Sequence, residues 1–338
     1  MKYIVLILCI MFLIISKRCN SKGRKIFIIM SAVTLLIFST FRGSILGGIY
    51  KGNDYESYRN WFFTIENVKI SLTNDILFNL LMLCIYKLTG CFEVFVFITS
   101  LISIYGIYKF AIDNSKNYTL LIYYFITFGM YELGLSAIRQ FLAISVFLMS
   151  FKFIHEKKFL KYLIGIIIAS MFHSSAAILI FIYPFINLKI KLNKKIIMLV
   201  IVALLTTILV KYGIFQNILI KYVPNYIYKY ANIGEELNSN YTVFLIATFI
   251  FIISLIFSNI RKELWKFDNC KFLYLCLLMV FSYLATLHVT FGRMLQYFMP
   301  AVALILPEEL ELLKEKNDII YKIGKIGSIV FFMLIYIL

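Results

Sequence analysis

Long apolar runs are the feature that most constrains how this 338-residue chain can fold. Hydrophobic residues make up 62% of the chain and charged residues 15%, whereas a soluble domain carries roughly 25% charged residues. An apolar stretch of about 17–25 residues matches the hydrocarbon thickness of a bilayer, and a chain in lipid must satisfy its backbone hydrogen bonds internally. The sequence therefore predicts an all-α, polytopic transmembrane helix bundle with about 11–13 membrane helices, some of them short or re-entrant. The expected helices are 3–16, 26–41, 76–89, 93–110, 118–134, 138–154, 159–172, 174–188, 196–212, 241–259, 271–289, 293–306 and 323–338.

A single integral membrane domain, 1–338, is expected, because the sequence shows no soluble domain and no internal repeat. The first apolar run is predicted to be a retained membrane helix, since its cations follow it in SKRCNSKGRK and no A-x-A cleavage site is present. The six cysteines form no C-x-x-C pair and lie mostly within or beside apolar runs. This placement is typical of small buried hydrophobes rather than of disulfides or metal ligands.

Charge and motif content exclude several classes of protein. The net charge of +17 would indicate nucleic-acid binding in a soluble protein. Here the cations fall in short segments between apolar runs, where they set membrane orientation, so no nucleic-acid partner is expected. The sequence contains no Walker lysine loop, no H-E-x-x-H and no Cys/His cluster. We therefore expect neither an ATP-driven pump nor a metal enzyme, and no cofactor.

Charge counting orients the predicted helices. Two long loops are balanced, 42–75 with four cations and four acids and 213–240 with two of each. Four shorter segments are cation-rich, namely 17–25, 152–161, 189–195 and 261–271. Because Lys and Arg accumulate in cytoplasmic loops, the cation-rich segments are predicted to be cytoplasmic and the two long loops to be extracytoplasmic.

This orientation places several polar residues on the outer side. The chain between cytoplasmic segments 152–161 and 189–195 must go up and come back, with its turn near His173. Arg139 begins a helix that descends to the cytoplasmic lysines, so it is also expected on the outer side. Three apolar segments, 76–89, 93–110 and 118–134, lie between the first outer loop and Arg139. Because both ends of this stretch are on the outer side, the chain must cross the membrane an even number of times between them, so one segment does not span. We expect the short segment 76–89 to be the one that does not span.

A cation at the centre of a membrane helix costs about 2.5–3.5 kcal/mol on insertion scales, so such residues are retained when they pair, reach water or function. The polar residues that the predicted topology gathers on the outer side are Arg42, Asp54, Arg59, Arg139, Gln140, His173, His288 and Arg293. Guanidinium groups bind phosphate oxygens in bidentate fashion, and histidine moves protons near neutral pH. The set favours a phosphate or pyrophosphate site at headgroup depth. Interfacial anchoring, helix capping or a local pair between Asp54 and Arg59 explains the same residues without any site.

Four short stretches, in order, carry a resemblance to a known family. They are FRGSILGGIYKGNDYESYRNWF after the second helix, SAIRQFLAIS, ASMFHSSAAILI and GRMLQYFMP. Together they span residues 42–300, and the chain resembles the EpsG family of Wzy-type bacterial polysaccharide polymerases. The spacer between Arg42 and Asp54 is longer than in the family pattern, so the match to the family's first arginine is weakest at Arg42.

The resemblance implies a metal-independent glycosyltransferase with a GT-C-like helix bundle in the bacterial cytoplasmic membrane. Such a polymerase joins oligosaccharide repeat units carried on undecaprenyl pyrophosphate at the outer face, in capsule, exopolysaccharide or O-antigen biosynthesis. Membrane lipid and the flippase and chain-length regulator of the same pathway are the implied partners. Arg139 and Arg293 would hold the pyrophosphate, and His173 or Asp54 would accept the proton. The other implied substrate-binding residues are Arg42, Tyr55, Tyr58, Arg59, Gln140 and His288.

Two other functions remain open from the residues alone. A transporter or flippase of lipid-linked oligosaccharide would use the same arginines, but it needs polar residues along a path through the midplane and repeated halves. The ionisable groups here cluster on one predicted side, and no repeat is visible. An outer-face acyltransferase requires a histidine with a second acid or base, and a path by which a cytoplasmic acyl donor reaches the outer face. Neither is seen in the sequence.

Overall fold

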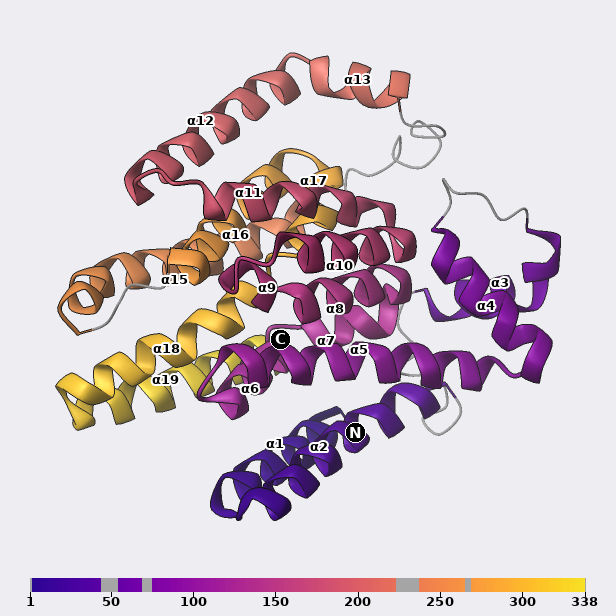
Figure 1. Cartoon of the computed structure of the whole chain (residues 1–338), viewed down its shortest axis with the longest axis horizontal. Coiled ribbons are helices and arrows are strands. Elements are labelled where there is room, and N and C mark those ends of the chain that lie inside the picture. The colour runs from indigo at the N-terminus through magenta and orange to yellow at the C-terminus, as the bar shows by residue number, and fades with distance from the viewer. Residues whose placement is uncertain (1, 44–53, 69–74, 223–236, 265–268, 338) are drawn as a thin grey trace. The chain divides into compact units, whose positions relative to one another are not determined.

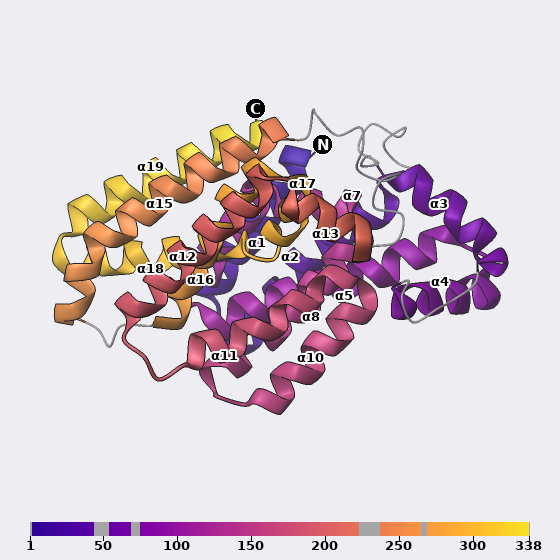
Figure 2. The same cartoon turned by 90° about the horizontal axis from the view of Figure 1, so that it is seen from above.

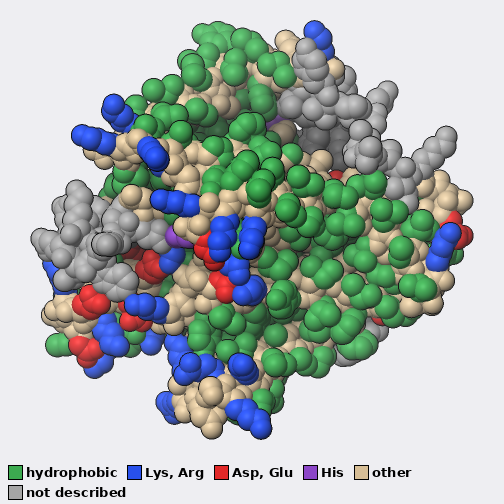
Figure 3. Space-filling view, viewed as in Figure 1, with side chains coloured by type: hydrophobic (Ala, Val, Ile, Leu, Met, Phe, Trp, Pro, Cys, Tyr) green, Lys and Arg blue, Asp and Glu red, His purple; other side chains and the backbone are tan. Residues whose placement is uncertain are grey.

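The computed structural model describes residues 2–43, 54–68, 75–222, 237–264 and 269–337 (Figure 1). This described part is built from helices joined by short turns and contains no strand, so the predicted all-α polytopic bundle is confirmed. Six of its helices are long and apolar enough to cross a membrane, or seven if the pair Val289–Leu295 and Pro300–Lys316, bent by 47°, forms one span. Five shorter apolar helices of 10–17 residues accompany them. Figure 3 shows hydrophobic side chains over much of the visible surface, as expected for helices that face lipid.

Two compact units divide the chain: Met1–Ile180 with Lys325–Leu338, and Phe181–Gly324. The expectation of a single membrane domain stays a prediction. The first unit contains the following helices: α1 Lys2–Arg18, α2 Ser21–Phe41, α3 Tyr55–Thr64, η1 Ile65–Asn67, α4 Ile76–Thr89, α5 Phe92–Asn114, α6 Tyr118–Thr127, α7 Met130–Ser136, α8 Ile138–Ser150, α9 Lys152–His155, α10 Phe159–Phe172, most of η2 Ser174–Phe181 and most of α19 Asp318–Ile337.

Helix α8 lies at the centre of the first unit, between α5 and α10 (Figures 1 and 2). Small residues allow this close packing. A Cβ added to Gly106 of α5 would come within 2.8 Å of the Ser145 carbonyl oxygen and Cβ on α8. A Cβ on Gly165 of α10 would collide with the Ser150 hydroxyl of α8. Small residues at such crossings let helix backbones approach each other in membranes, and they fix how α8 is held by its neighbours.

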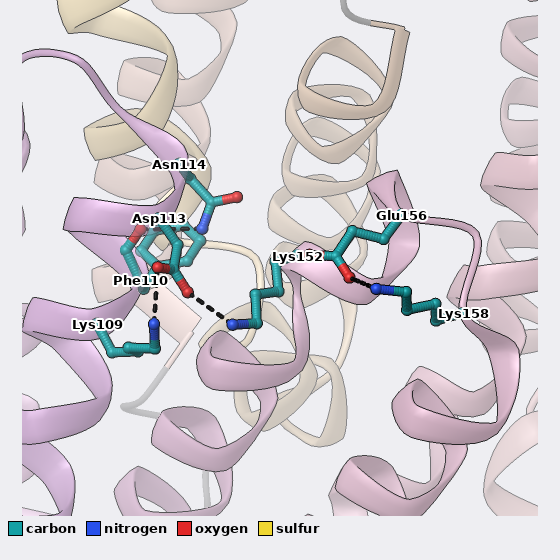
Figure 4. Close-up of polar contacts among 7 residues, drawn as sticks. All are labelled: Lys109, Phe110, Asp113, Asn114, Lys152, Glu156 and Lys158. Atoms are coloured by element: carbon teal, nitrogen blue, oxygen red, sulfur yellow. Dashed lines mark hydrogen bonds and ion pairs between the residues drawn. The ribbon is translucent and has the colours of Figure 1, made fainter.

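One end of this three-helix layer is rich in charge (Figure 4). Asp113, near the end of α5, accepts from Lys109 at 2.8 Å and lies 3.3 Å from the ammonium nitrogen of Lys152. Nearby, Lys158 donates to Glu156 at 2.6 Å. Arg139 starts α8 and His173 follows α10, so both lie at the opposite end of these two helices. The layer therefore has a lysine-rich end and an end that carries the predicted site residues.

Two predicted α-helices, 118–134 and 293–306, are interrupted by a break in the structure. The segment 118–134 is broken into α6 and α7 at Gly129, whose φ of 80° is left-handed. Gly129 accommodates this turn because it has no Cβ, and neither half is long enough to span. Segment 93–110 lies in the 23-residue α5, and segment 76–89 is the 14-residue α4.

The predicted helix 293–306 was wrong. The chain forms α17 Val289–Leu295, breaks, and restarts as a helix at Pro300, a residue suited to a first helical turn.

The second unit contains the remaining helices: α11 Ile182–Asn187, α12 Leu192–Lys211, α13 Ile214–Tyr222, α15 Leu237–Leu264, α16 Asn269–Leu287, α17, and α18 Pro300–Lys316. Both α12 and α15 pack against α16. The predicted outer loops 42–75 and 213–240 include α3, η1 and α13, and their residues 44–53, 69–74 and 223–236 lie outside the described residues. All six cysteines are free.

Candidate active site

Three donors from two helix ends converge on one carboxylate. Arg139 Nη1 donates to Asp75 Oδ2 at 2.8 Å, and the Ser174 backbone N–H donates to Asp75 Oδ1 at 3.0 Å. His173 Nδ1 lies 3.4 Å from Asp75 Oδ2. These four residues, which we call the Asp75 cluster, come from the start of α4, the start of α8 and the junction between α10 and η2. The structure thus brings Arg139 and His173 to one site, joined by an acid that sequence reasoning had not selected.

The local backbone aims each of these groups. Asp75 is left-handed, with φ 47° and ψ 53°, immediately before α4, a conformation that Asp tolerates better than most residues because its short polar side chain bonds locally. Its carbonyl still accepts the Asn79 N–H at 3.1 Å. His173 is extended at the end of α10, where its N–H bonds to the Ala169 carbonyl. This turn points the Ser174 amide and the imidazole at the same carboxylate.

Electrostatics keep Asp75 ionised. Burial alone would raise the pKa of its carboxyl group. The hydrogen bond and charge of His173, the charge of Arg139 and the Ser174 amide outweigh burial, and the pKa of Asp75 lies below its ordinary value. The exposed fraction of the side chain is 9% for Asp75, 10% for His173 and 26% for Arg139. When Nδ1–H of His173 faces this carboxylate, Nε2 carries the lone pair, which is the arrangement of a general base held by an acid.

Arg139 keeps unused donors. Its guanidinium lies over the Trp61 ring, with Cζ 4.9 Å from the ring centroid, and 5.9 Å from that of Phe78. Aromatic faces attract the cation without occupying its N–H groups. Within the described residues only Nη1 has an acceptor, and the buried Nε has none. A buried donor without a partner costs about 1–3 kcal/mol, which an anionic ligand on the Nε–Nη2 edge would relieve.

Arg42 is buried and bonded to main-chain carbonyls, and its expected contact with substrate stays a prediction. It is 1% exposed, and its guanidinium donates to the Ser39 carbonyl and, at 2.9 Å, to the Leu135 carbonyl. It also lies over the ring of Tyr55 at 4.9 Å. Burial lowers the pKa of Arg42 to about 10, so it stays protonated at neutral pH. Arg42 thereby joins the end of α2 to α3 and to α7. Helix α7 directly precedes α8, which carries Arg139 at its start.

The other predicted residues of the first unit surround this site to different degrees. Tyr58 is buried and stacks on Trp61 at 6.3 Å between ring centroids, and Gln140 is buried beside Arg139 in sequence. Asp54 is exposed at the start of α3, and Arg59 lies 4.0 Å from Glu56 on the same helix. In the described part of the chain, neither Asp54 nor Arg59 forms a hydrogen bond or ion pair with the Asp75 cluster.

His288 and Arg293 belong to the second unit. The His288 Nδ1 accepts the Thr290 N–H at 3.2 Å and so caps α17, and its ring meets Phe215 edge-on at 5.3 Å between centroids. Burial lowers the pKa of His288, which favours the neutral imidazole at pH 7. Arg293 lies on α17, the short helix between α16 and α18. The predicted gathering of Arg293 with Arg139 and His173 stays a prediction.

Sequence reasoning missed Asp75 and Trp61. Asp75 had been counted among the charges of the outer loop, and its position directly before an apolar helix was the available signal. Trp61 lies in YRNWF, one of the stretches that carry the family resemblance. The described residues contain no group of three or more His, Cys, Asp or Glu side chains placed to hold a metal ion.

Comparison with known proteins yields one match. No curated protein and no solved structure matches the chain. The family model of the EpsG family matches residues 25–338, nearly the whole chain, and that range includes every residue of the Asp75 cluster. The chain therefore belongs to the EpsG family, a family of polysaccharide polymerases.

Proposed function

We propose that this protein joins oligosaccharide repeat units carried on undecaprenyl pyrophosphate, at the outer face of the bacterial cytoplasmic membrane. The observation that carries the proposal is the Asp75 cluster: a carboxylate that holds a histidine, beside an arginine with an open donor edge. The product would be a capsule, exopolysaccharide or O-antigen chain. Family membership supports polymerisation, and the cluster supports transfer from a phosphate-linked donor.

The position of the cluster along α8 supports the outer face. The continuous segment Ile138–His155 is about 27 Å long at 1.5 Å per residue, close to the thickness of the hydrocarbon core. Arg139 lies at its start, and the lysine-rich segment 152–161 lies at its end. Lysine-rich ends are cytoplasmic by the charge rule for membrane proteins, so the Asp75 cluster is assigned to the extracytoplasmic boundary.

Arg139 is proposed to bind the pyrophosphate. Its Nε and Nη2 form the side-on edge of the guanidinium, which matches two oxygens of one phosphate. Asp75 compensates the arginine charge while no substrate is bound, and it occupies only Nη1. In the reaction the bond between the donor sugar carbon and its pyrophosphate oxygen breaks, and charge grows on the leaving pyrophosphate. A fixed cation at that position stabilises this charge without reorganisation.

His173 is proposed as the general base. The hydroxyl of the acceptor sugar attacks the donor carbon, the new carbon–oxygen bond forms, and the hydroxyl proton passes to His173 Nε2. Asp75 would orient the imidazole through Nδ1 and stabilise the imidazolium that results. Asp54, the other candidate base, is exposed at the start of α3, so we favour His173. The proton then leaves to solvent at the membrane boundary.

The remaining assignments are substrate contacts and support. Tyr58 and Trp61 form an aromatic face beside Arg139, and aromatic faces suit sugar rings. Tyr55, Arg59, Gln140, His288 and Arg293 are retained as proposed substrate-binding residues, with Arg293 as a second pyrophosphate ligand. Arg42 is proposed to position the start of α8 through Leu135. The lipid-linked substrate, membrane lipid and the flippase and chain-length regulator of the pathway remain the proposed partners.

The decisive experiment separates a polymerase from a flippase. Arg139→Ala and His173→Ala are expressed in a host whose polysaccharide depends on this gene. We expect long polymer to disappear while single repeat units accumulate on lipid carrier at the outer face. Accumulation on the cytoplasmic side would instead support the transporter alternative. His155→Ala and Arg24→Ala are the matched controls, because both side chains are exposed and neither contacts the Asp75 cluster.

A further inference from the structure

The second unit contains an apolar pocket of about 340 Å³ between α12, α15 and α16. Its lining includes Leu199 and Ala203 of α12, Phe244 and Phe251 of α15, and Met279 of α16. The hydroxyl of Tyr283, at its edge, is engaged with the Thr207 hydroxyl at 3.1 Å. The lining therefore offers hydrocarbon contacts and almost no hydrogen-bonding group to an occupant.

Helix packing explains why this space is open to lipid. Both α12 and α15 pack on α16, but only 17% of the apolar window of α12 is buried. Large side chains such as Val200 and Leu204 lie half exposed along the pocket. An extended peptide segment placed here would leave its backbone polar groups without partners in an apolar site. A flexible hydrocarbon chain has no such groups to satisfy.

Unpaired cations stand at one end of the same helix. Lys189, Lys191 and Lys194 are exposed just before and within the first turn of α12, and no described carboxylate pairs with them. The adjacent Lys195 is different, because its ammonium is buried against the Ile186 carbonyl. The sequence from residue 157 to residue 234 contains no acidic residue at all. The three lysines thus present an uncompensated positive charge where a membrane span begins.

We propose that this pocket holds an acyl chain of an anionic phospholipid whose phosphate group contacts Lys189, Lys191 and Lys194. The pocket residues on α12 run from Ile196 to Leu204, about 12 Å along the helix, and they start two residues after Lys194. Headgroup and chain contacts therefore follow each other along one helix. The site is independent of the Asp75 cluster and of the proposed reaction, and its test uses binding rather than polymerisation.

The test is lipid retention by the full chain, measured by native mass spectrometry after exchange into detergent with either phosphatidylglycerol or phosphatidylcholine. Each lysine near an anionic lipid contributes about fivefold to binding, so replacing all three by Gln is expected to weaken phosphatidylglycerol binding on the order of 100-fold. Phosphatidylcholine binding should hardly change. Ala203→Phe, which fills the pocket, is expected to reduce binding of both lipids.

The matched control replaces Lys22, Arg24 and Lys25, another run of three exposed cations at the start of a membrane span, by Gln. This change removes the same charge at the start of a different helix, one that does not line the α12 pocket, and we expect full lipid retention. Equal loss in the control and in the α12 variant would overturn the proposal, since it would indicate general charge attraction. Unchanged binding in Ala203→Phe, or preferential retention of a polyprenyl phosphate over phosphatidylglycerol, would also overturn it.

Discussion

Replacing Asp75 by Asn tests the centre of the proposed site with little change in shape. Asn tolerates the left-handed backbone at this position, and its oxygen can still accept the Ser174 N–H. The substitution removes the negative charge opposite Arg139 and His173. Its effects on activity and stability therefore report the charge of the carboxylate rather than its space or its backbone conformation.

The expected loss of activity is large. A positioned general base contributes roughly 10²–10⁴-fold to a rate, and a histidine without its orienting acid loses much of this contribution. We expect turnover of purified Asp75→Asn to fall by about 10²–10⁴-fold. The assay follows polymer length from lipid-linked repeat units on a gel. Asp113→Asn is the control, because Asp113 also pairs with two cations, at the lysine-rich end of the layer. Turnover near the unsubstituted level in Asp75→Asn would refute the role assigned to Asp75 and His173.

The stability effect of the same substitution is smaller and depends on pH. The bond to Arg139 is charge-assisted, but the arginine side chain is 26% exposed and partly screened, so we expect a loss of about 1–2 kcal/mol at pH 7. The folded-state pKa of Asp75 lies below its ordinary value. The carboxylate therefore contributes stability above about pH 4, and this contribution is lost as the pH falls through the folded-state pKa. The difference in unfolding temperature between the two proteins should therefore shrink as the pH falls below about 4. A difference that grows below pH 4 would contradict this linkage.

Three further substitutions probe how the site is held. Arg42→Met leaves two carbonyl acceptors without their donor, and we expect about 2–4 kcal/mol of destabilisation by thermal unfolding in detergent; an unchanged midpoint would argue against an anchoring role. Trp61→Leu removes the face under Arg139, worth about 0.5–2 kcal/mol, and should raise KM for the lipid-linked donor about 2- to 30-fold with a smaller change in kcat. A fall in kcat alone would point to a role in chemistry instead. Gly106→Val would press α5 away from Ser145 and cost about 1–3 kcal/mol, seen as a lower yield of monodisperse protein in size-exclusion chromatography.

The sequence by itself determined the membrane class, most helix positions and the family. Apolar run length is compared directly with bilayer thickness, so segments such as 138–154 and 159–172 were predicted close to α8 with α9 and to α10. Lysine counts in short loops are also local quantities, and they assigned Arg139 and His173 to the same predicted side. The structure then shows both side chains within hydrogen-bond distance of Asp75.

Tertiary packing alone decided which groups touch. Asp75 meets Arg139 across 64 residues and His173 across 98, and no local pattern records such pairs. Helices in lipid are apolar on nearly all sides. Their sequences therefore lack the stripe of apolar residues from which the buried face of a helix in a soluble protein is predicted. The approach of α5 and α10 to α8 depends on small residues at single crossings, and that approach sets where the helix ends lie. Arg42 shows the same dependence: its position at the end of an apolar run left anchoring and substrate binding both open, and packing buried it against main-chain carbonyls.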